Sequence, residues 1–297
     1  MDAEILEKYK KAGRLAAQAR NLAIGMCRPG VKLLDIAERA EEHIIRNGGR
    51  PAFPVNISVN DIAAHYTPMH GDGKVVEEED LVKIDVGAHV DGYIGDTAAT
   101  WSSGSHELVK AVERVLRDAI KVLRPGVTVG EIGSAIEGSA ESQGVGLILN
   151  LTGHTLDRYV FHGQPAILNT SNDSRHAFRE GDVIAIEPFT CHDNGHVKEG
   201  GVTEIYRFLQ RRPVRLPEAR RILELAEGDY RSLPFAKRWL YKEVSPVKVA
   251  LAMRQLDSVM ALEPYSVLRE VSGMSIAQAE HTIIIQGKPL VTTRLED

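Results

Sequence analysis

Apolar residues recur at helical spacing in four stretches of the chain, with polar residues on the opposite faces. In each stretch the apolar positions fall every three or four residues, so that one face of an amphipathic helix can pack against a core. A Cys-Arg-Pro-Gly sequence ends the first stretch, because proline cannot continue a helix and glycine accepts the conformation of a helix end. The spacing predicts helices over residues 3–26, 35–46, 108–123 and 129–142.

The sequence Arg-Pro-Gly-Val occurs twice, at residues 28–31 and again 96 residues later at 124–127. Each copy lies between two predicted helices and is followed by a histidine, His65 in the first case and His162 in the second. A repeated order of elements at a nearly fixed separation is typical of an internal duplication. The alternative is that two helical hairpins resemble each other by composition alone.

An apolar strand that carries an acid follows in both places. EEDLVKIDVG at residues 78–87 matches REGDVIAIEP at residues 179–188, which aligns Asp85 with Glu187. The series helix, Arg-Pro-Gly-Val, helix, histidine, strand and acid therefore predicts two helix–helix–strand halves within one domain, around a pseudo-twofold axis.

The strand of the first half continues into a hairpin, KIDVGAHVDGYIGD at residues 83–96. Asp91-Gly92 is a typical two-residue hairpin turn between apolar runs. With this turn, Asp85 pairs with Ala98, and Asp96 lies on the same face as a diagonal neighbour, about 7 to 8 Å away between Cα atoms. Two such carboxylates can hold metal ions about 3.5 to 4 Å apart; the alternative is that Asp96 is a solvated strand acid and Asp85 a turn cap.

Composition and charge limit the class of protein. The chain has 297 residues, of which 43% are hydrophobic and 26% charged, as in globular domains. It contains no run of about 20 apolar residues, so we expect a cytoplasmic protein with no membrane partner. Cys27 and Cys191 are too few and too far apart for a disulfide framework or a paired-cysteine zinc site. A net charge of −5 argues against a general nucleic-acid coat but leaves room for local basic patches. We expect no specific DNA partner, and we expect a monomer.

Residues 205–262 interrupt the repeat with a proline-broken, helix-like and arginine-rich segment. We expect this segment to be an inserted, mostly helical subdomain within a single catalytic domain that spans residues 1–297. After it, residues 277–286 resume an apolar pattern and are predicted to return to the main sheet as a strand. His192 and His196, just before the insert, are expected to lie in a surface loop because Asn194 and Gly195 favour a turn.

Acids and a histidine interrupt apolar segments at five places: Asp85, Asp96, His154, Glu187 and Glu280. A carboxylate buried in a sheet loses its charge or destabilises the fold by several kcal/mol unless a cation lies beside it. Lysines and arginines are not interleaved with these positions, so metal ions are the expected cations. Oxygen and imidazole ligands suit a pair of hard or borderline divalent ions better than a structural zinc site, which favours thiolates.

These motifs resemble the methionine aminopeptidases, and in particular the type 2 branch in its short archaeal form. The resemblance covers nearly the whole chain and is carried by DVG-x7-GD at residues 85–96, GH at 153–154, IEPF at 186–189 and AEHTI at 279–283. It implies the α+β "pita-bread" metallopeptidase fold, with the duplicated halves around an antiparallel sheet. It also implies removal of an N-terminal methionine from nascent chains whose second residue is small.

The resemblance further implies two divalent metal ions, which can be cobalt, manganese, iron or zinc. Asp85 would hold one ion, His154 and Glu187 the other, while Asp96 and Glu280 bridge both. Glu187 is then also the proton acceptor of the reaction.

The resemblance places substrate-side groups as well. His65 would steady the peptide near the scissile amide, and His162 would donate to its carbonyl oxygen. Three aromatic residues, Phe53, Phe161 and Tyr265, match positions near the methionine pocket; core packing is the alternative for the two phenylalanines.

Two other functions remain open from the sequence. Proline-specific aminopeptidases and prolidases share the fold and the ligand pattern. Pita-bread proteins that have lost catalysis bind ribosomes or nucleic acid, and the arginines at residues 207–221 suggest a ribosomal contact for the insert.

Overall fold

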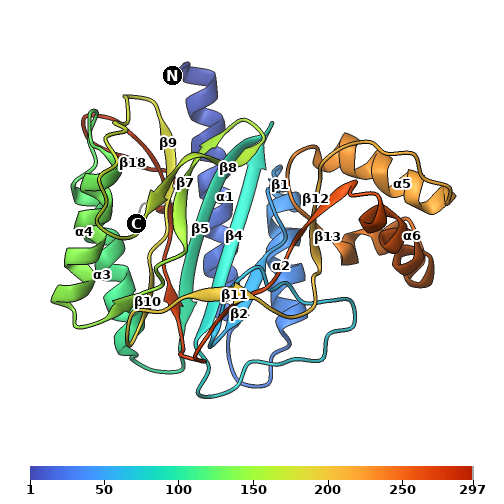
Figure 1. Cartoon of the computed structure of the whole chain (residues 1–297), viewed down its shortest axis with the longest axis horizontal. Coiled ribbons are helices and arrows are strands. Elements are labelled where there is room, and N and C mark those ends of the chain that lie inside the picture. The colour runs from blue at the N-terminus through green and yellow to red at the C-terminus, as the bar shows by residue number, and fades with distance from the viewer. Residues whose placement is uncertain (296–297) are drawn as a thin grey trace.

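Four long helices form where the hydrophobic pattern predicts them, in two pairs that pack on antiparallel sheets (Figure 1). The structure is a computed structural model that describes residues 1–295. The second helix begins two residues before the predicted start and the third ends two residues before the predicted end. The helices are α1 (Ala3–Met26), α2 (Leu33–Arg46), α3 (Glu107–Lys121) and α4 (Val129–Ser142).

The predicted hairpin forms in the predicted register. β4 (Val82–Val90) and β5 (Tyr93–Trp101) pair antiparallel, with Asp85 opposite Ala98. Asp91 and Gly92 have φ angles of 54° and 89°, and positive φ at both central residues defines the type I′ turn that matches the twist of a hairpin. This turn fixes the register, which brings Asp85 and Asp96 to one face of the sheet.

The strands divide among several small sheets, all built from antiparallel strand pairs. β4 and β5 form a four-stranded sheet with β1 (Arg50–Pro51) and β2 (Asn56–Val59). The second half forms a five-stranded sheet in the order β18-β17-β9-β7-β8. Its strands are β7 (Thr152–Asp157), β8 (Val160–Leu168), β9 (Val183–Ile186), β17 (His281–Ile284) and β18 (Leu290–Val291). The remaining strands outside the insert are β3 (Ile62–Ala64), β6 (Gly146–Leu147), β10 (Phe189–Cys191), β11 (Val197–Glu199), β15 (Leu268–Glu270) and β16 (Ala277–Gln278).

The predicted single strand over residues 277–286 is wrong in detail. The segment forms two short strands, β16 and β17, and Ala279 and Glu280 lie between them. β16 pairs with β10, whereas β17 pairs with β9, so the chain changes its pairing partner at Glu280.

The two halves repeat the same hydrogen bonds where the helices of each pair are joined. The Gly30 amide donates to the Val76 carbonyl at 2.9 Å, and the Gly126 amide donates to the Phe178 carbonyl at 2.7 Å. Both glycines have left-handed backbones, with φ angles of 88° and 90°, which explains why each repeat needs glycine there. The duplication predicted from sequence is therefore present in the backbone geometry.

The turn before each central strand repeats as well. The Asp80 carboxylate accepts from the Glu77 amide at 2.8 Å, and the Asp182 carboxylate accepts from the Arg179 amide at 2.7 Å. The first turn leads into β4, which carries Asp85, and the second leads into β9, which is followed by Glu187, so equivalent turns position equivalent acids.

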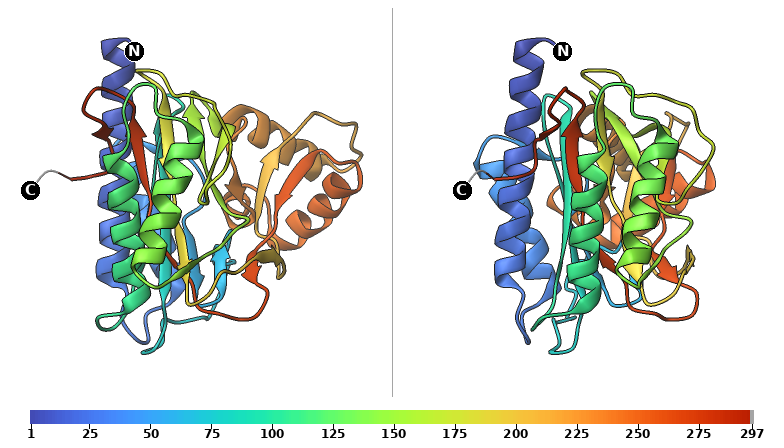
Figure 2. Two further views of the ribbon diagram at one scale, coloured as in Figure 1. Left: turned by 60° about the vertical axis from the view of Figure 1, so that its left-hand side comes forward. Right: turned by 90° about the vertical axis from the view of Figure 1, so that its left-hand side faces the viewer.

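Each helix pair covers its own core. α1 and α2 pack on β2 and β4 through one buried apolar cluster, and α3 and α4 pack on β9 and β17 through another. α1 and α2 lie behind β4 and β5 in Figure 1, while α3 and α4 come to the front when the molecule is turned by 90° (Figure 2). Within residues 1–295, no helix combines the length and apolarity needed to cross a membrane.

Residues 205–262 form a unit with its own apolar core, at the side away from α3 and α4 (Figure 1). Three strands pair in the order β13-β12-β14, and most residues of the segment lie in helices. Its elements are β12 (Ile205–Phe208), α5 (Pro217–Leu225), a π-helical turn (Ala226–Tyr230), β13 (Phe235–Ala236), a 3-10 helix (Lys237–Lys242), α6 (Pro246–Ser258) and β14 (Leu262–Tyr265).

Candidate metal centre

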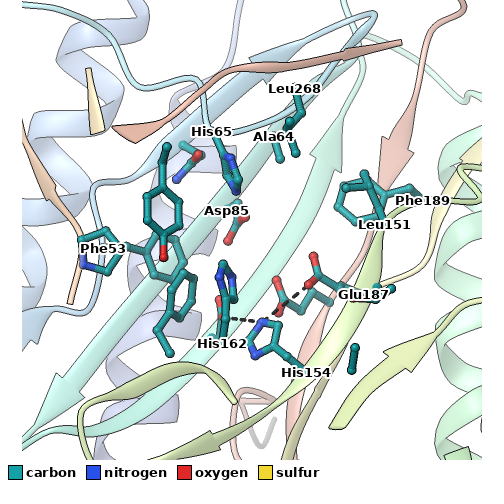
Figure 3. Close-up of a pocket in the computed structure, with 18 of the residues that line it drawn as sticks. Phe53, Ala64, His65, Asp85, Leu151, His154, His162, Glu187, Phe189 and Leu268 are labelled. Carbon is teal, nitrogen blue, oxygen red and sulfur yellow. Dashed lines mark ion pairs between the residues drawn. The ribbon is translucent and has the colours of Figure 1, made fainter. Parts of the chain in front are cut away.

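A cavity of about 290 Å³ lies where the two sheets meet, and it collects every site residue predicted from the sequence (Figure 3). Residues of both halves and of the insert line it, which explains why residues far apart in the chain come together. The predicted residues in its wall are Phe53, His65, Asp85, Asp96, His154, Phe161, His162, Glu187, Tyr265 and Glu280.

Strand geometry aims the five candidate ligands at this cavity. Asp85 and Asp96 share one face of the hairpin, as described above. His154 on β7 pairs with Ala185 on β9, and Glu187 follows two residues later, so both side chains point to the same face. Glu280 enters from the segment between β16 and β17.

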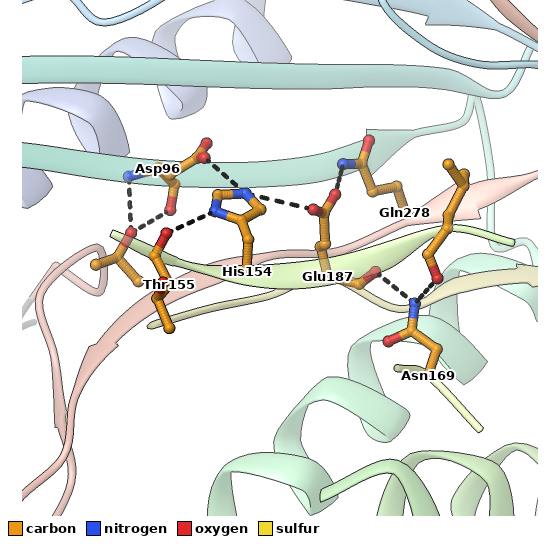
Figure 4. A network of polar contacts seen from close by, with 8 residues as sticks. Asp96, His154, Thr155, Asn169, Glu187 and Gln278 are labelled. Carbon is orange, nitrogen blue, oxygen red and sulfur yellow. Dashed lines mark hydrogen bonds and ion pairs between the residues drawn. The ribbon is translucent and has the colours of Figure 1, made fainter. Parts of the chain in front are cut away.

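His154 presents one ring nitrogen to the acids. Its Nδ1 lies 3.3 Å from the Thr155 carbonyl, a contact in which Nδ1–H donates, so Nε2 keeps its lone pair (Figure 4). Nε2 lies 3.7 Å from Asp96 Oδ2 and 3.5 Å from Glu187 Oε1. Burial lowers the pKa of His154 to about 4, so the imidazole is neutral and these contacts are not ion pairs at neutral pH. A neutral nitrogen and two carboxylates that face one another are the donors of a divalent metal ion.

Burial raises the pKa of all four carboxyl groups, and neighbouring acids raise the pKa of three of them further. Burial raises the pKa of Asp85 to about 7. Burial is also the main cause that raises the pKa of Asp96, Glu187 and Glu280 well above the usual range, and the neighbouring carboxylates raise it further. Like charges this close need a cation to remain ionised together.

The donor set fits a metal ion. Asp85 Oδ1, Asp96 Oδ1 and Glu280 Oε1 are buried and receive no hydrogen bond from the described residues. One ligand atom each from Asp96, His154 and Glu280 lies within 4.8 Å of the other two. Buried oxygens normally have a partner, and here a metal ion is the partner that the chemistry of the set allows.

Two further histidines line the cavity in the neutral form. The Nδ1 of His65 lies 3.1 Å from the Ser266 carbonyl and donates to it, so its Nε2 is an acceptor. His65 also has a φ angle of 63°, a strained conformation for this residue type. Burial lowers the pKa of both His65 and His162.

An aromatic wall adjoins these histidines. The rings of Phe53 and Phe161 are 4.6 Å apart between centroids, and His162 stacks on Phe161 at 4.0 Å. Tyr265 lies 5.9 Å from His162 on the other side. Phe53 belongs to a buried apolar cluster and Phe161 packs against it, so both rings line the cavity and also contribute to core packing.

Sequence reasoning missed Gln278 and the threonines behind the acids. The Gln278 amide lies 3.5 Å from Glu187 Oε2, and its hydrogen bonding lowers the pKa of Asp85 and Glu187. Gln278, Glu280 and Thr282 occupy alternate positions of an apolar run, a period of two that marks one polar face of an extended segment. This alternation in the sequence could have identified Gln278 and Thr282 as neighbours of Glu280 on the polar face.

His192 and His196 are exposed and lie apart from this cavity, as predicted for a surface loop.

The site and fold define a metallopeptidase. Residues 7–215 match the model of metallopeptidase family M24, and the chain belongs to that family. Within this family, curated relatives similar to the chain are named methionine aminopeptidases. A methionine aminopeptidase of Thermococcus onnurineus is 47% identical over 94% of this chain and 96% of that protein, and one of Archaeoglobus fulgidus is 46% identical over 99% of this chain and 100% of that protein.

Solved structures agree on the fold. The structure of a thermophilic Arx1 matches with a TM-score of 0.86 at 16% identity, covering 100% of this chain and 93% of that one. The methionine aminopeptidase of Thermotoga maritima matches with a TM-score of 0.70 at 24% identity, covering 99% and 98%. The predicted pita-bread α+β fold and the predicted membership among metallo-aminopeptidases of the methionine aminopeptidase kind are confirmed.

Proposed function

We propose that this chain removes the N-terminal methionine from nascent chains with a small second residue, and that two divalent metal ions occupy the cavity between the sheets. The observation that carries the proposal is the convergence of four carboxylates and a neutral imidazole with unpaired buried oxygens. Asp85 would hold one ion, His154 and Glu187 the other, and Asp96 and Glu280 both. Cobalt, manganese, iron and zinc all suit these ligands.

Bound divalent ions supply an activated water and a polarised scissile carbonyl. Glu187 takes a proton from the water and delivers it to the departing amine, which its raised pKa favours. His162, neutral and stacked beside the ligands, donates its N–H to the carbonyl oxygen of the scissile bond. His65 accepts from the substrate backbone through Nε2, because its Nδ1 is engaged by Ser266.

The apolar part of the cavity would set the specificity for methionine. Phe53, Phe161 and Tyr265 form the wall into which an unbranched thioether would extend. Because one methylene is worth only about 1 to 3 kcal/mol, the pocket should accept other unbranched side chains weakly.

Cleavage of matched peptides tests this function and its enzymatic alternative. The metal-loaded protein should release methionine from Met-Ala-Ser and leave Ala-Pro intact. Rapid cleavage of Ala-Pro with no cleavage of Met-Ala-Ser would assign the chain to the proline-specific branch. Glu280→Ala, processed in parallel, controls for contaminating peptidases.

Three of the insert's arginines form ion pairs within the protein, which limits the arginines that a ribosome could contact. Arg207 forms an ion pair with Glu263 at 2.5 Å, Arg221 pairs with Glu243 at 3.0 Å, and Arg211 pairs with Glu227. These internal pairs leave Arg212, Arg215 and Arg220, all exposed, as the groups available to an RNA phosphate. Replacing these three by glutamine and measuring co-sedimentation with ribosomes tests the contact, and unchanged sedimentation removes it.

A further inference from the structure

The sheets of the two halves meet at a seam formed by β5 and the segment 278–282. One backbone hydrogen bond, from the Glu280 amide to the Ala98 carbonyl at 2.9 Å, joins these two segments in the part of the chain that the structure describes. A step of two residues along β5 corresponds to a step of two back along the facing segment, so Asp96 faces Thr282 and Thr100 faces Gln278.

Threonine hydroxyls make the other connections of the seam. Thr282 Oγ1 accepts from the Asp96 amide at 2.8 Å and donates to the Asp96 carbonyl at 2.8 Å (Figure 4). Thr100 Oγ1 accepts from the Gln278 amide at 2.8 Å and donates to the Gln278 carbonyl at 2.7 Å. Each hydroxyl therefore holds both backbone groups of one residue on the opposite segment, in place of a ladder between backbones.

A third hydroxyl acts on Glu280. Thr97 Oγ1 donates to the Glu280 carbonyl at 2.8 Å and accepts from the Arg20 guanidinium of α1. Because Arg20 donates to the oxygen, the hydroxyl hydrogen is directed to Glu280. Thr97 and Thr282 are completely buried, so water does not compete for these bonds.

The hydroxyls hold the two candidate bridging acids, Asp96 and Glu280, and also Gln278, whose side chain bonds Glu187. Asp96 and Glu280 are both buried beside the same cavity, so their carboxylates repel when both are ionised. Within residues 1–295, a single backbone hydrogen bond joins these two segments. The hydroxyl bonds are therefore what resists separation of the acids before a metal ion binds.

We propose that Thr282, Thr100 and Thr97 are positioning residues that set the spacing of Asp96 and Glu280 for metal binding. The proposal rests on the proposed function, in which these two acids bridge the ions. Its physical content is preorganisation: groups behind a metal ligand fix its orientation, and their loss typically lowers metal affinity by about 10- to 100-fold.

Calorimetric titration of Mn²⁺ into the metal-free protein tests this role, together with the urea midpoint of the metal-free protein. Thr282→Val keeps the shape but removes the hydroxyl, and Thr282→Ser restores it. Thr190→Val is the matched control, because Thr190 is also fully buried and its hydroxyl donates to the carbonyl of Leu108 in α3, which belongs to neither segment of the seam. Thr100→Val provides a second test at the other end of the seam if Thr282→Val does not fold.

Thr282→Val should bind Mn²⁺ at least tenfold more weakly than the parent, with Thr282→Ser near the parent value. Thr190→Val should shift the urea midpoint and leave the Mn²⁺ affinity within about twofold. Parent-like affinity in both Thr282→Val and Thr100→Val would overturn the positioning role alone. A parent protein that takes up no Mn²⁺ would overturn the proposed function and this inference with it.

Discussion

Gly87→Ala is the sharpest test of the cavity wall. Gly87 lies on β4, two residues after Asp85, directly beneath the ring of Phe53. A Cβ at this position would lie 2.1, 2.5 and 2.9 Å from three ring carbons of Phe53. Ordinary contact begins near 3.4 Å, so the ring must retreat by roughly 1 Å or more. Phe161 stands 4.6 Å away between ring centroids, so Phe53 cannot move without disturbing the aromatic wall.

Two opposed effects decide whether Gly87→Ala raises or lowers the free energy of unfolding. Alanine in a strand interior is favoured over glycine by roughly 0.5 to 1 kcal/mol where space is free. Overpacking of a filled core is unfavourable by about 1 to 3 kcal/mol. Since the clash is with a ring that is 3% exposed, we expect the second effect to prevail and the variant to be less stable by about 1 to 2 kcal/mol.

Activity should fall selectively. If the displaced Phe53 ring fills a volume of the pocket equal to one methylene group, transition-state binding weakens by about 1 to 3 kcal/mol. The kcat/KM for Met-Ala-Ser should then fall roughly 10- to 200-fold. A peptide that begins with alanine reaches less far into the pocket and should lose less. Phe53→Leu in the Gly87→Ala background should recover part of both stability and activity, because it removes the atoms that clash.

Urea unfolding and peptide cleavage measure the two effects. Gly138→Ala, in α4, is the matched control, because a Cβ there meets no atom within 4 Å, and it should be neutral or stabilising. A Gly87→Ala protein as stable and as active on Met-Ala-Ser as the parent would refute the assignment of Phe53 to the wall.

Three further predictions concern the ligands and the reaction. Glu280→Ala should lose metal, measured by elemental analysis, and nearly all turnover, because it removes one of the bridging acids; full activity would end that assignment. His162→Ala should keep its metal content and lower kcat about 10²-fold in the peptide assay, whereas a change in KM alone would speak against a donor to the carbonyl oxygen. In the metal-free protein, burial raises the pKa of Asp85 to about 7, so its contribution to stability is present below about pH 4 and is lost as the pH rises through 7. Asp85→Asn should therefore exceed the metal-free parent in urea midpoint by more at pH 8 than at pH 5, and the same difference at both pH values would contradict the raised pKa.

Local sequence patterns were enough to predict the helices and the hairpin. The spacing of apolar residues predicted α1 and α4 with the observed bounds, and Asp91-Gly92 predicted the register that brings Asp85 and Asp96 together. These features depend on near neighbours in the chain, so a pattern of a few residues contains the information.

The division into sheets depended on contacts that no local pattern contains. The break at Ala279 and Glu280 arises because the flanking strands pair with different partners, β10 and β9. The threonine hydroxyls of the seam bond across 178 or more positions of sequence, and the sequence pattern of a buried threonine in an apolar run is that of an ordinary strand. The family resemblance predicted which residues form the site. The structure showed in addition that His154 is neutral and that its Nε2 is free to bind a metal ion.

The duplicated backbone has a consequence for how the site can be asymmetric. Two identical chains related by a twofold axis present the same residue on both sides of the axis. One chain that contains the repeat twice is free of this constraint, so the repeat position that holds aspartate at Asp85 holds glutamate at Glu187. A longer carboxylate on one side only gives the two sides different reach toward a shared centre, which is what a reaction with one attacking side and one departing side requires.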